Sequence, residues 1–71
     1  MKTKTLVKLA RHIESVTGQR FNGTIWELWV ALKPASDCKT KKEAVKVISE
    51  EVYAFPHNGD YPEQEKAMLN F

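Results

Sequence analysis

The chain has 71 residues and a formal net charge of +2, and 42% of its residues are hydrophobic. This length allows a single domain, and the ordinary apolar content excludes an intrinsically disordered chain. One cysteine and two histidines exclude an internal disulfide and lead us to expect no metal site or cofactor. No apolar run is long enough to span a membrane or form a signal-peptide core, so we expect no membrane association and a cytoplasmic location.

The first predicted element is an amphipathic helix over residues 4–17. Thr3 is its expected N-cap, and Gly18 is expected to end it because glycine readily adopts the left-handed conformation. The opposite faces of this helix differ sharply in chemistry, which is typical of a helix packed on a core. Its apolar face comprises Leu6, Leu9, Ala10, Ile13 and Val16, and its basic face carries Lys4, Lys8 and Arg11.

A second helix, predicted over residues 24–33, contains both tryptophans. Thr24 and Glu27 have the spacing of a capping box, and Pro34 is expected to end the helix. One apolar row is expected to pack between the first and third helices, which would place this helix centrally and Trp29 in the core. That row consists of Ile25, Leu28, Trp29 and Leu32.

Trp26 and Val30 form a second apolar row on the same predicted helix. Two interpretations of this row remain open. It could pack beneath a neighbouring helix, or it could form an interface with a partner or with a second copy of the chain. Tryptophan is enriched among the residues that dominate binding energy at interfaces.

A loop is expected over residues 34–39, followed by a third helix over residues 40–55. Thr40 and Glu43 again have capping-box spacing, and Pro56 is expected to end the helix. One face of this helix is apolar and another is polar. The apolar residues are Ala44, Val45, Ile48, Val52 and Phe55, and the polar group comprises Lys42, Lys46, Ser49 and Tyr53.

A turn at residues 57–59 and a short helix at residues 61–70 complete the predicted fold. Asp60 is the expected cap of this helix, and its apolar side chains are expected to dock on the core. These side chains are Ala67, Met68 and Phe71. The sequence therefore predicts one all-α domain, a compact three-helix bundle with a short fourth C-terminal helix.

The sequence contains no recognisable catalytic constellation. His12 and His57 lack any spacing to Cys38 that would indicate a nucleophile–base pair, and there is no glycine-rich phosphate loop. We therefore expect neither an enzyme nor a protein with a small-molecule substrate.

The first functional hypothesis is a small protein-binding module. Its partner would be another protein or a second copy in a homodimer, and its role that of an adaptor, inhibitor or regulator of the kind compact bacterial or phage genomes encode. An exposed aromatic patch with basic flanks would make the contact. Trp26, Val30 and Tyr53 are the predicted contact residues, and Lys8 and Arg11 are predicted to steer the partner.

The alternative is a DNA-binding regulator that resembles a helix-turn-helix protein. The predicted third helix would enter the major groove, and lysines on two helices would contact phosphates. The loop before this helix is longer than the tight turn usual in helix-turn-helix proteins. The polar face of the helix lacks the Arg, Asn or Gln that make bidentate base contacts. The predicted phosphate contacts are Lys4, Lys8, Arg11, Lys39, Lys41, Lys42 and Lys46.

Overall fold

The computed structural model describes residues 1–55, 59 and 61–71, and the regular elements within these residues are all helical. This confirms the all-α class. The finer expectation of three helices and a short fourth is not confirmed, because the second and third predicted helices are each divided. The elements are α1 (Thr3–Thr17), α2 (Ile25–Ala31), α3 (Lys33–Ser36), α4 (Lys41–Val47), the π-helix η1 (Ile48–Val52) and α5 (Tyr61–Leu69).

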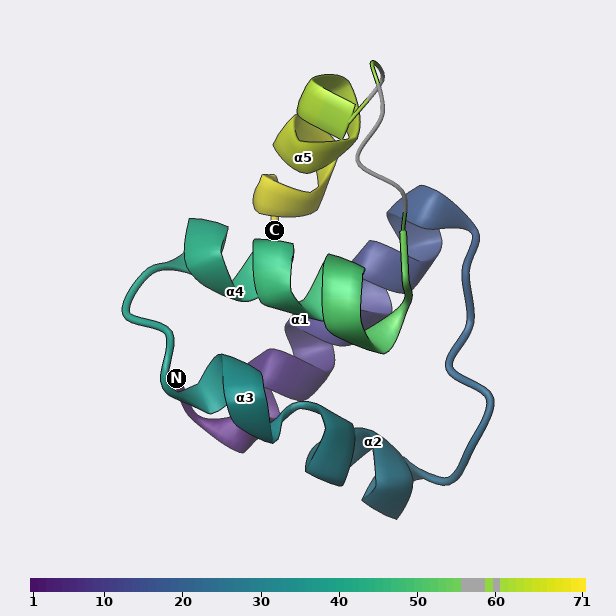
Figure 1. The fold of residues 1–71 in the computed structure, drawn as a ribbon, viewed down its shortest axis with the longest axis vertical. Helices are drawn as coiled ribbons and strands as arrows, with labels where there is room; N and C mark the ends of the chain where they lie inside the picture. Colours follow the sequence, from purple (N-terminus) through teal and green to yellow (C-terminus); the bar gives the residue numbers. More distant parts are fainter. Residues whose placement is uncertain (56–58, 60) are drawn as a thin grey trace.

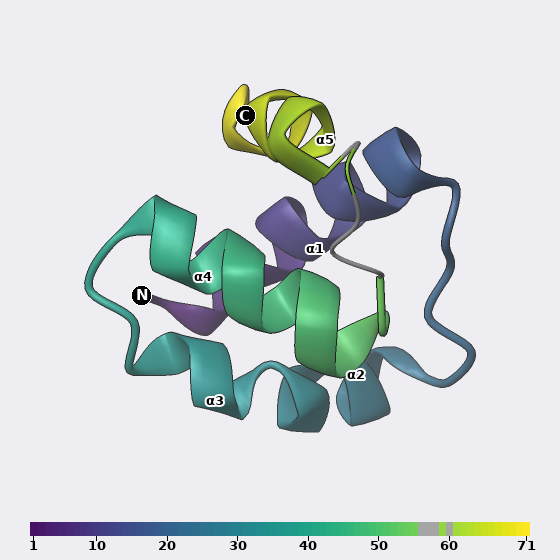
Figure 2. The ribbon, with the colours of Figure 1, turned by 45° about the horizontal axis from the view of Figure 1, so that its top comes forward.

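Helix α1 is the central element and packs against α2, α3, α4 and α5 (Figures 1 and 2). Its predicted apolar face is confirmed, because four of the five residues are buried and Val16 is partly buried against them. Gly18 caps the helix at φ +77°, and its N–H donates to the Glu14 carbonyl at 2.9 Å, as predicted. The expected Thr3 cap is wrong: Lys2 occupies the N-cap position and makes no side-chain cap.

Helix α2 is shorter and more peripheral than predicted. Its capping box is confirmed: the Thr24 hydroxyl accepts from the Glu27 N–H at 3.1 Å, and the Glu27 carboxylate accepts from the Thr24 N–H at 3.3 Å. Its main contacts are with α1 and α3, and it lies at the end of the molecule away from α5 (Figures 1 and 2). The expected central position is wrong because Leu28 is the only buried residue within α2.

Pro34 lies in a helix instead of in the predicted loop. It lies in the first turn of α3, where the missing N–H of proline costs little because it has no partner there in any case. The segment predicted as a loop is therefore helical up to Ser36. Leu32, between α2 and α3, and Ala35 are both buried in the core.

The third predicted helix changes geometry halfway along its length. Helix α4 begins as predicted, with the Thr40 hydroxyl accepting from the Glu43 N–H at 3.2 Å, although the Glu43 carboxylate accepts from the Lys39 N–H instead of completing the box. The chain then widens into η1, where the Tyr53 N–H donates to the Ile48 carbonyl. The wider turn shifts the helical faces, so Ser49 and Tyr53, predicted on the polar face, are buried.

Helix α5 packs against α1 and α4 and covers the core at the end opposite α2 (Figures 1 and 2). Met68 is fully buried, which confirms its predicted docking, whereas Ala67 is exposed and Phe71 is half-exposed. His12 of α1 donates from Nε2 to the Ala67 carbonyl at 2.8 Å. The Lys41 ammonium donates to the Leu69 carbonyl at 3.1 Å. The predicted turn at His57 and Asn58 and the Asp60 cap lie outside the described residues.

The buried Met68 leads to a stability prediction. Met68→Ala is expected to lower the free energy of unfolding by about 2–5 kcal/mol, because the substitution leaves a cavity where α5 meets the core. Lys66→Ala, on the exposed side of the same helix, is the matched control and is expected to change stability by less than about 0.5 kcal/mol. Urea unfolding followed by circular dichroism measures both. Equal small losses for the two variants would contradict the docking of α5.

Candidate functional site

Four large apolar side chains of α2 are exposed to solvent. We call Ile25, Trp26, Trp29 and Val30 the tryptophan patch; among the described residues, Phe71 is the one other large hydrophobic side chain that is similarly exposed. Trp26 is 68% exposed and Trp29 is 44% exposed. The predicted core position of Trp29 is therefore wrong. Leu28 and Leu32 face inward, and the four patch residues occupy the neighbouring arc of the helix.

The two indole rings lie beside a small hollow. Their centroids are 6.0 Å apart with an angle of 33° between the ring planes, within the range of interacting aromatic pairs. The hollow has a volume of about 150 Å³ and is lined by Thr3, Trp26, Trp29, Val30 and Lys33. The patch is thus a concave aromatic surface between α2, the start of α3 and the first turn of α1.

Local interactions determine where α2 begins. A Cβ added at Gly23 would lie 2.7 Å from the Phe21 ring and 3.2 Å from the Glu27 carboxylate, so glycine allows the close approach of this turn. The capping box then directs the chain into the helix at Thr24. Leu28 and Leu32 anchor the helix on the core, which leaves the tryptophan patch on the outer side.

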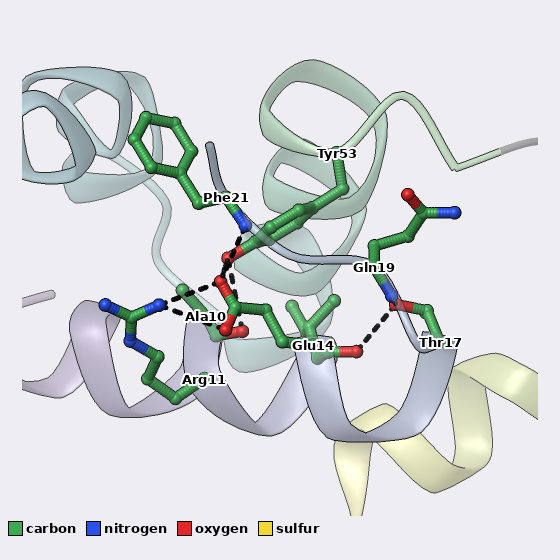
Figure 3. A network of polar contacts seen from close by, with 8 residues as sticks. Ala10, Arg11, Glu14, Thr17, Gln19, Phe21 and Tyr53 are labelled. Atoms are coloured by element: carbon green, nitrogen blue, oxygen red, sulfur yellow. Dashed lines mark hydrogen bonds and ion pairs between the residues drawn. The ribbon is translucent and has the colours of Figure 1, made fainter. Parts of the chain in front are cut away.

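The buried carboxylate of Glu14 holds residues 18–24, the connector between α1 and α2, in place. Figure 3 shows the Glu14 side chain pointing toward Tyr53, Arg11 and the backbone of Phe21. Glu14 accepts from the Tyr53 hydroxyl at 2.8 Å, from the Phe21 N–H at 3.1 Å and from the Arg11 guanidinium at 3.0 Å. We call this set the Glu14 network. It joins α1, the connector and the end of η1 in one cluster.

The Glu14 network changes the acidity of two of its members. Burial raises the pKa of the Glu14 carboxyl, but the hydrogen bonds from Tyr53, Phe21 and Arg11 outweigh burial, and the net effect lowers its pKa from the ordinary value of a glutamate. Burial, followed by the hydrogen bond to Glu14, raises the pKa of Tyr53 well above its usual range. At neutral pH the pair is therefore a carboxylate and a neutral phenol.

Tyr53 does not belong to the exposed contact surface that the sequence predicts. It is 8% exposed and its hydroxyl faces Glu14, so this part of the predicted site is wrong. Helical spacing at 3.6 residues per turn places Tyr53 beside Lys42 and Lys46. The π-helical turn rotates it inward, and sequence periodicity contains no signal for that turn.

Only some of the predicted basic residues are exposed and without a partner among the described residues that would compete with a binding partner. Arg11, predicted for steering and for phosphate contact, is paired with Glu14 while its side chain stays half-exposed. Lys41 donates to the Leu69 and Phe71 carbonyls and lies 5.1 Å from the centroid of the Phe71 ring. The remaining predicted phosphate contacts are exposed: Lys4, Lys8, Lys39, Lys42 and Lys46.

A second, larger hollow of about 370 Å³ lies at the end of α1, lined by Arg11, Glu14, Ser15, Gly18, Gln19 and Arg20. The Glu14 carboxylate that faces it is already satisfied by three donors.

None of the helices among the described residues combines the length and apolar character needed to cross a bilayer.

Comparison of the chain with protein-family models, with curated proteins and with solved structures found no match.

The tryptophan patch leads to a spectroscopic prediction. Because the chain has two tryptophans and both lie in the patch, its tryptophan fluorescence, excited selectively over the two tyrosines, reports on this surface alone. We expect both indoles to be quenched by acrylamide in a protein that sedimentation shows to be monomeric. Trp26→Phe and Trp29→Phe separate the two signals, and the more exposed Trp26 is expected to quench more strongly. Two shielded indoles in a monomer would contradict the exposed patch.

The Glu14 network leads to a prediction about pH. The folded-state pKa of Glu14 is depressed, so its stabilising contribution is present above the unfolded pKa and is lost as pH falls through the folded value. Glu14→Gln is therefore expected to flatten the decline in the free energy of unfolding over the acidic range below about pH 5. Urea titrations at several pH values measure this slope. The exposed Glu63→Gln is the control, and an unchanged slope in Glu14→Gln would contradict the assignment.

Proposed function

We propose that this protein is a non-enzymatic binding module that recognises another protein through the tryptophan patch. The observation that carries the proposal is that both tryptophans lie exposed on one short helix, beside a hollow, while Leu28 is the one buried residue of that helix. The role is that of an adaptor, inhibitor or regulator. Lys8 stays proposed for electrostatic steering, together with the half-exposed Arg11.

The cost of leaving these side chains in water supports the proposal. Small domains need their large apolar residues for the core, since they bury a smaller share of their surface than large domains do. Here Trp26, Trp29, Ile25 and Val30 contribute comparatively little burial. A contiguous apolar surface of this kind is typical of an interaction site. Tryptophan is also the residue most enriched among interface hot spots.

The energetics indicate that the apolar surface needs additional contacts. Burying one large apolar side chain contributes about 1.5–3 kcal/mol. The four patch side chains are 44–68% exposed, so burying the exposed part of them supplies roughly half of four such contributions, which lies at the lower end of the roughly 4–15 kcal/mol that association costs. A partner that binds tightly therefore also has to make favourable contacts with the polar rim of the patch.

The DNA-binding alternative receives less support from the same residues. Arg11 and Lys41 both have partners within the chain, so phosphate contacts would have to replace these interactions. The other predicted phosphate contacts are all lysines, and they belong to α1, α4 and the segment before α4. Lysine contacts to phosphate position a protein on DNA but do not read its sequence.

Capture experiments with matched variants test the proposal. We expect Trp26→Ala to lose partner proteins from a lysate of the organism that encodes the chain, while its thermal unfolding stays close to that of the wild type because the side chain is mostly exposed. Lys46→Ala is the control on the basic surface. Nuclease treatment is expected to change nothing. Capture that survives Trp26→Ala but not nuclease, together with duplex-DNA binding at low salt, would favour the alternative.

A further inference from the structure

We infer that the tryptophan patch receives an acidic segment of its partner, which inserts one apolar side chain into the hollow and places carboxylates against the basic rim. This inference rests on the proposed function and names the chemistry of the occupant. Two observations carry it: the size of the hollow and the charges around it.

The hollow is suited to a single side chain. Its volume of about 150 Å³ matches that of an engineered apolar cavity that binds benzene. A leucine or phenylalanine side chain is of this size. Three of the five lining residues are the two tryptophans and Val30, so an apolar side chain suits the hollow, with Thr3 and Lys33 at its polar side.

The charge around the hollow is positive. Lys33 lines it directly, and Lys2 and Lys4 flank Thr3, the lining residue contributed by α1; all three lysines are exposed. Among the described residues, no acidic side chain lines the hollow. The acidic residue of α2, Glu27, accepts from the Thr24 N–H and hydroxyl within the capping box. Carboxylates of a partner would therefore meet uncompensated lysines.

This charge pattern disfavours a second copy of the chain as the occupant. A symmetric dimer uses the same patch on both copies, so it would bring two Lys33 side chains into one apolar interface. Glu63 is exposed on α5, which lies at the opposite end of the molecule from α2 (Figures 1 and 2). This acidic residue is therefore too far from the patch to neutralise those lysines in such a dimer.

Peptide display tests the inference and does not require the partner to be identified. A library of random peptides is selected on the purified full chain, with the Trp26→Ala protein used to remove peptides that bind elsewhere. We expect the remaining peptides to carry a leucine or phenylalanine and to be enriched in Asp and Glu relative to the starting library. Synthetic versions are then titrated against the protein, with tryptophan fluorescence as the readout.

A charge reversal provides the matched comparison. Lys33→Glu is expected to weaken binding of the selected peptides about three- to tenfold, as the loss and reversal of a rim charge pair implies. Its fold is expected to be preserved because a carboxylate in the first turn of α3 is favourable. Lys46→Glu on α4 is the control and is expected to leave affinity unchanged. Added salt is expected to weaken wild-type binding and to have less effect on Lys33→Glu.

The outcomes separate the inference from the proposed function. Trp26-dependent peptides that are neutral or basic would overturn the acidic partner while the binding role stands. A selection that yields no Trp26-dependent peptide would overturn both. Two further results would overturn the acidic segment and indicate another occupant of the patch. One is a Trp26-dependent dimer in sedimentation, and the other is a Trp26-dependent fluorescence shift with phosphatidylglycerol vesicles but not with the peptides.

Discussion

The buried carboxylate of Glu14 is the constraint on which the arrangement of this protein depends. A buried charge is tolerated when hydrogen bonds satisfy it, and here the donors come from three separate parts of the chain: Arg11 in α1, the Phe21 backbone and the Tyr53 hydroxyl. The carboxylate thus draws the connector and the end of η1 onto α1. Because the connector is held at Phe21, α2 begins at the edge of the molecule, and its aromatic face is left uncovered.

Local signals account for the parts of the fold that the sequence predicts correctly. The apolar periodicity of α1, the Thr24 capping box and Gly18 each depend on residues close together in the chain, so they can be recognised without the tertiary structure. The π-helical turn is different. It places Tyr53 against Glu14, a contact between residues 39 positions apart, and no short-range pattern encodes such a contact.

The candidate site is only partly predictable for a related reason. The row of Trp26 and Val30 is visible in the sequence, and both side chains are exposed in the structure. The position of Trp29 is not predictable in this way, because helical spacing defines which residues share a face but not how deeply that face is covered. The covering depends on where α2 packs, and the long-range Glu14 network decides that position. The hollow with Lys33 and Thr3 joins α1 to α2 and α3, which periodicity cannot reveal.

The small number of buried side chains in α2 has a consequence for its motions. A seven-residue helix anchored through Leu28, with Leu32 just beyond its end, has few contacts to lose when it detaches from the core. Segments with few buried apolar contacts open locally at a lower free energy than global unfolding requires. Amide protons of α2 should therefore exchange with solvent faster than those of α1, and an occupant of the patch would slow them by holding the helix in place. The surface that is offered for recognition is then also the element whose order recognition would increase.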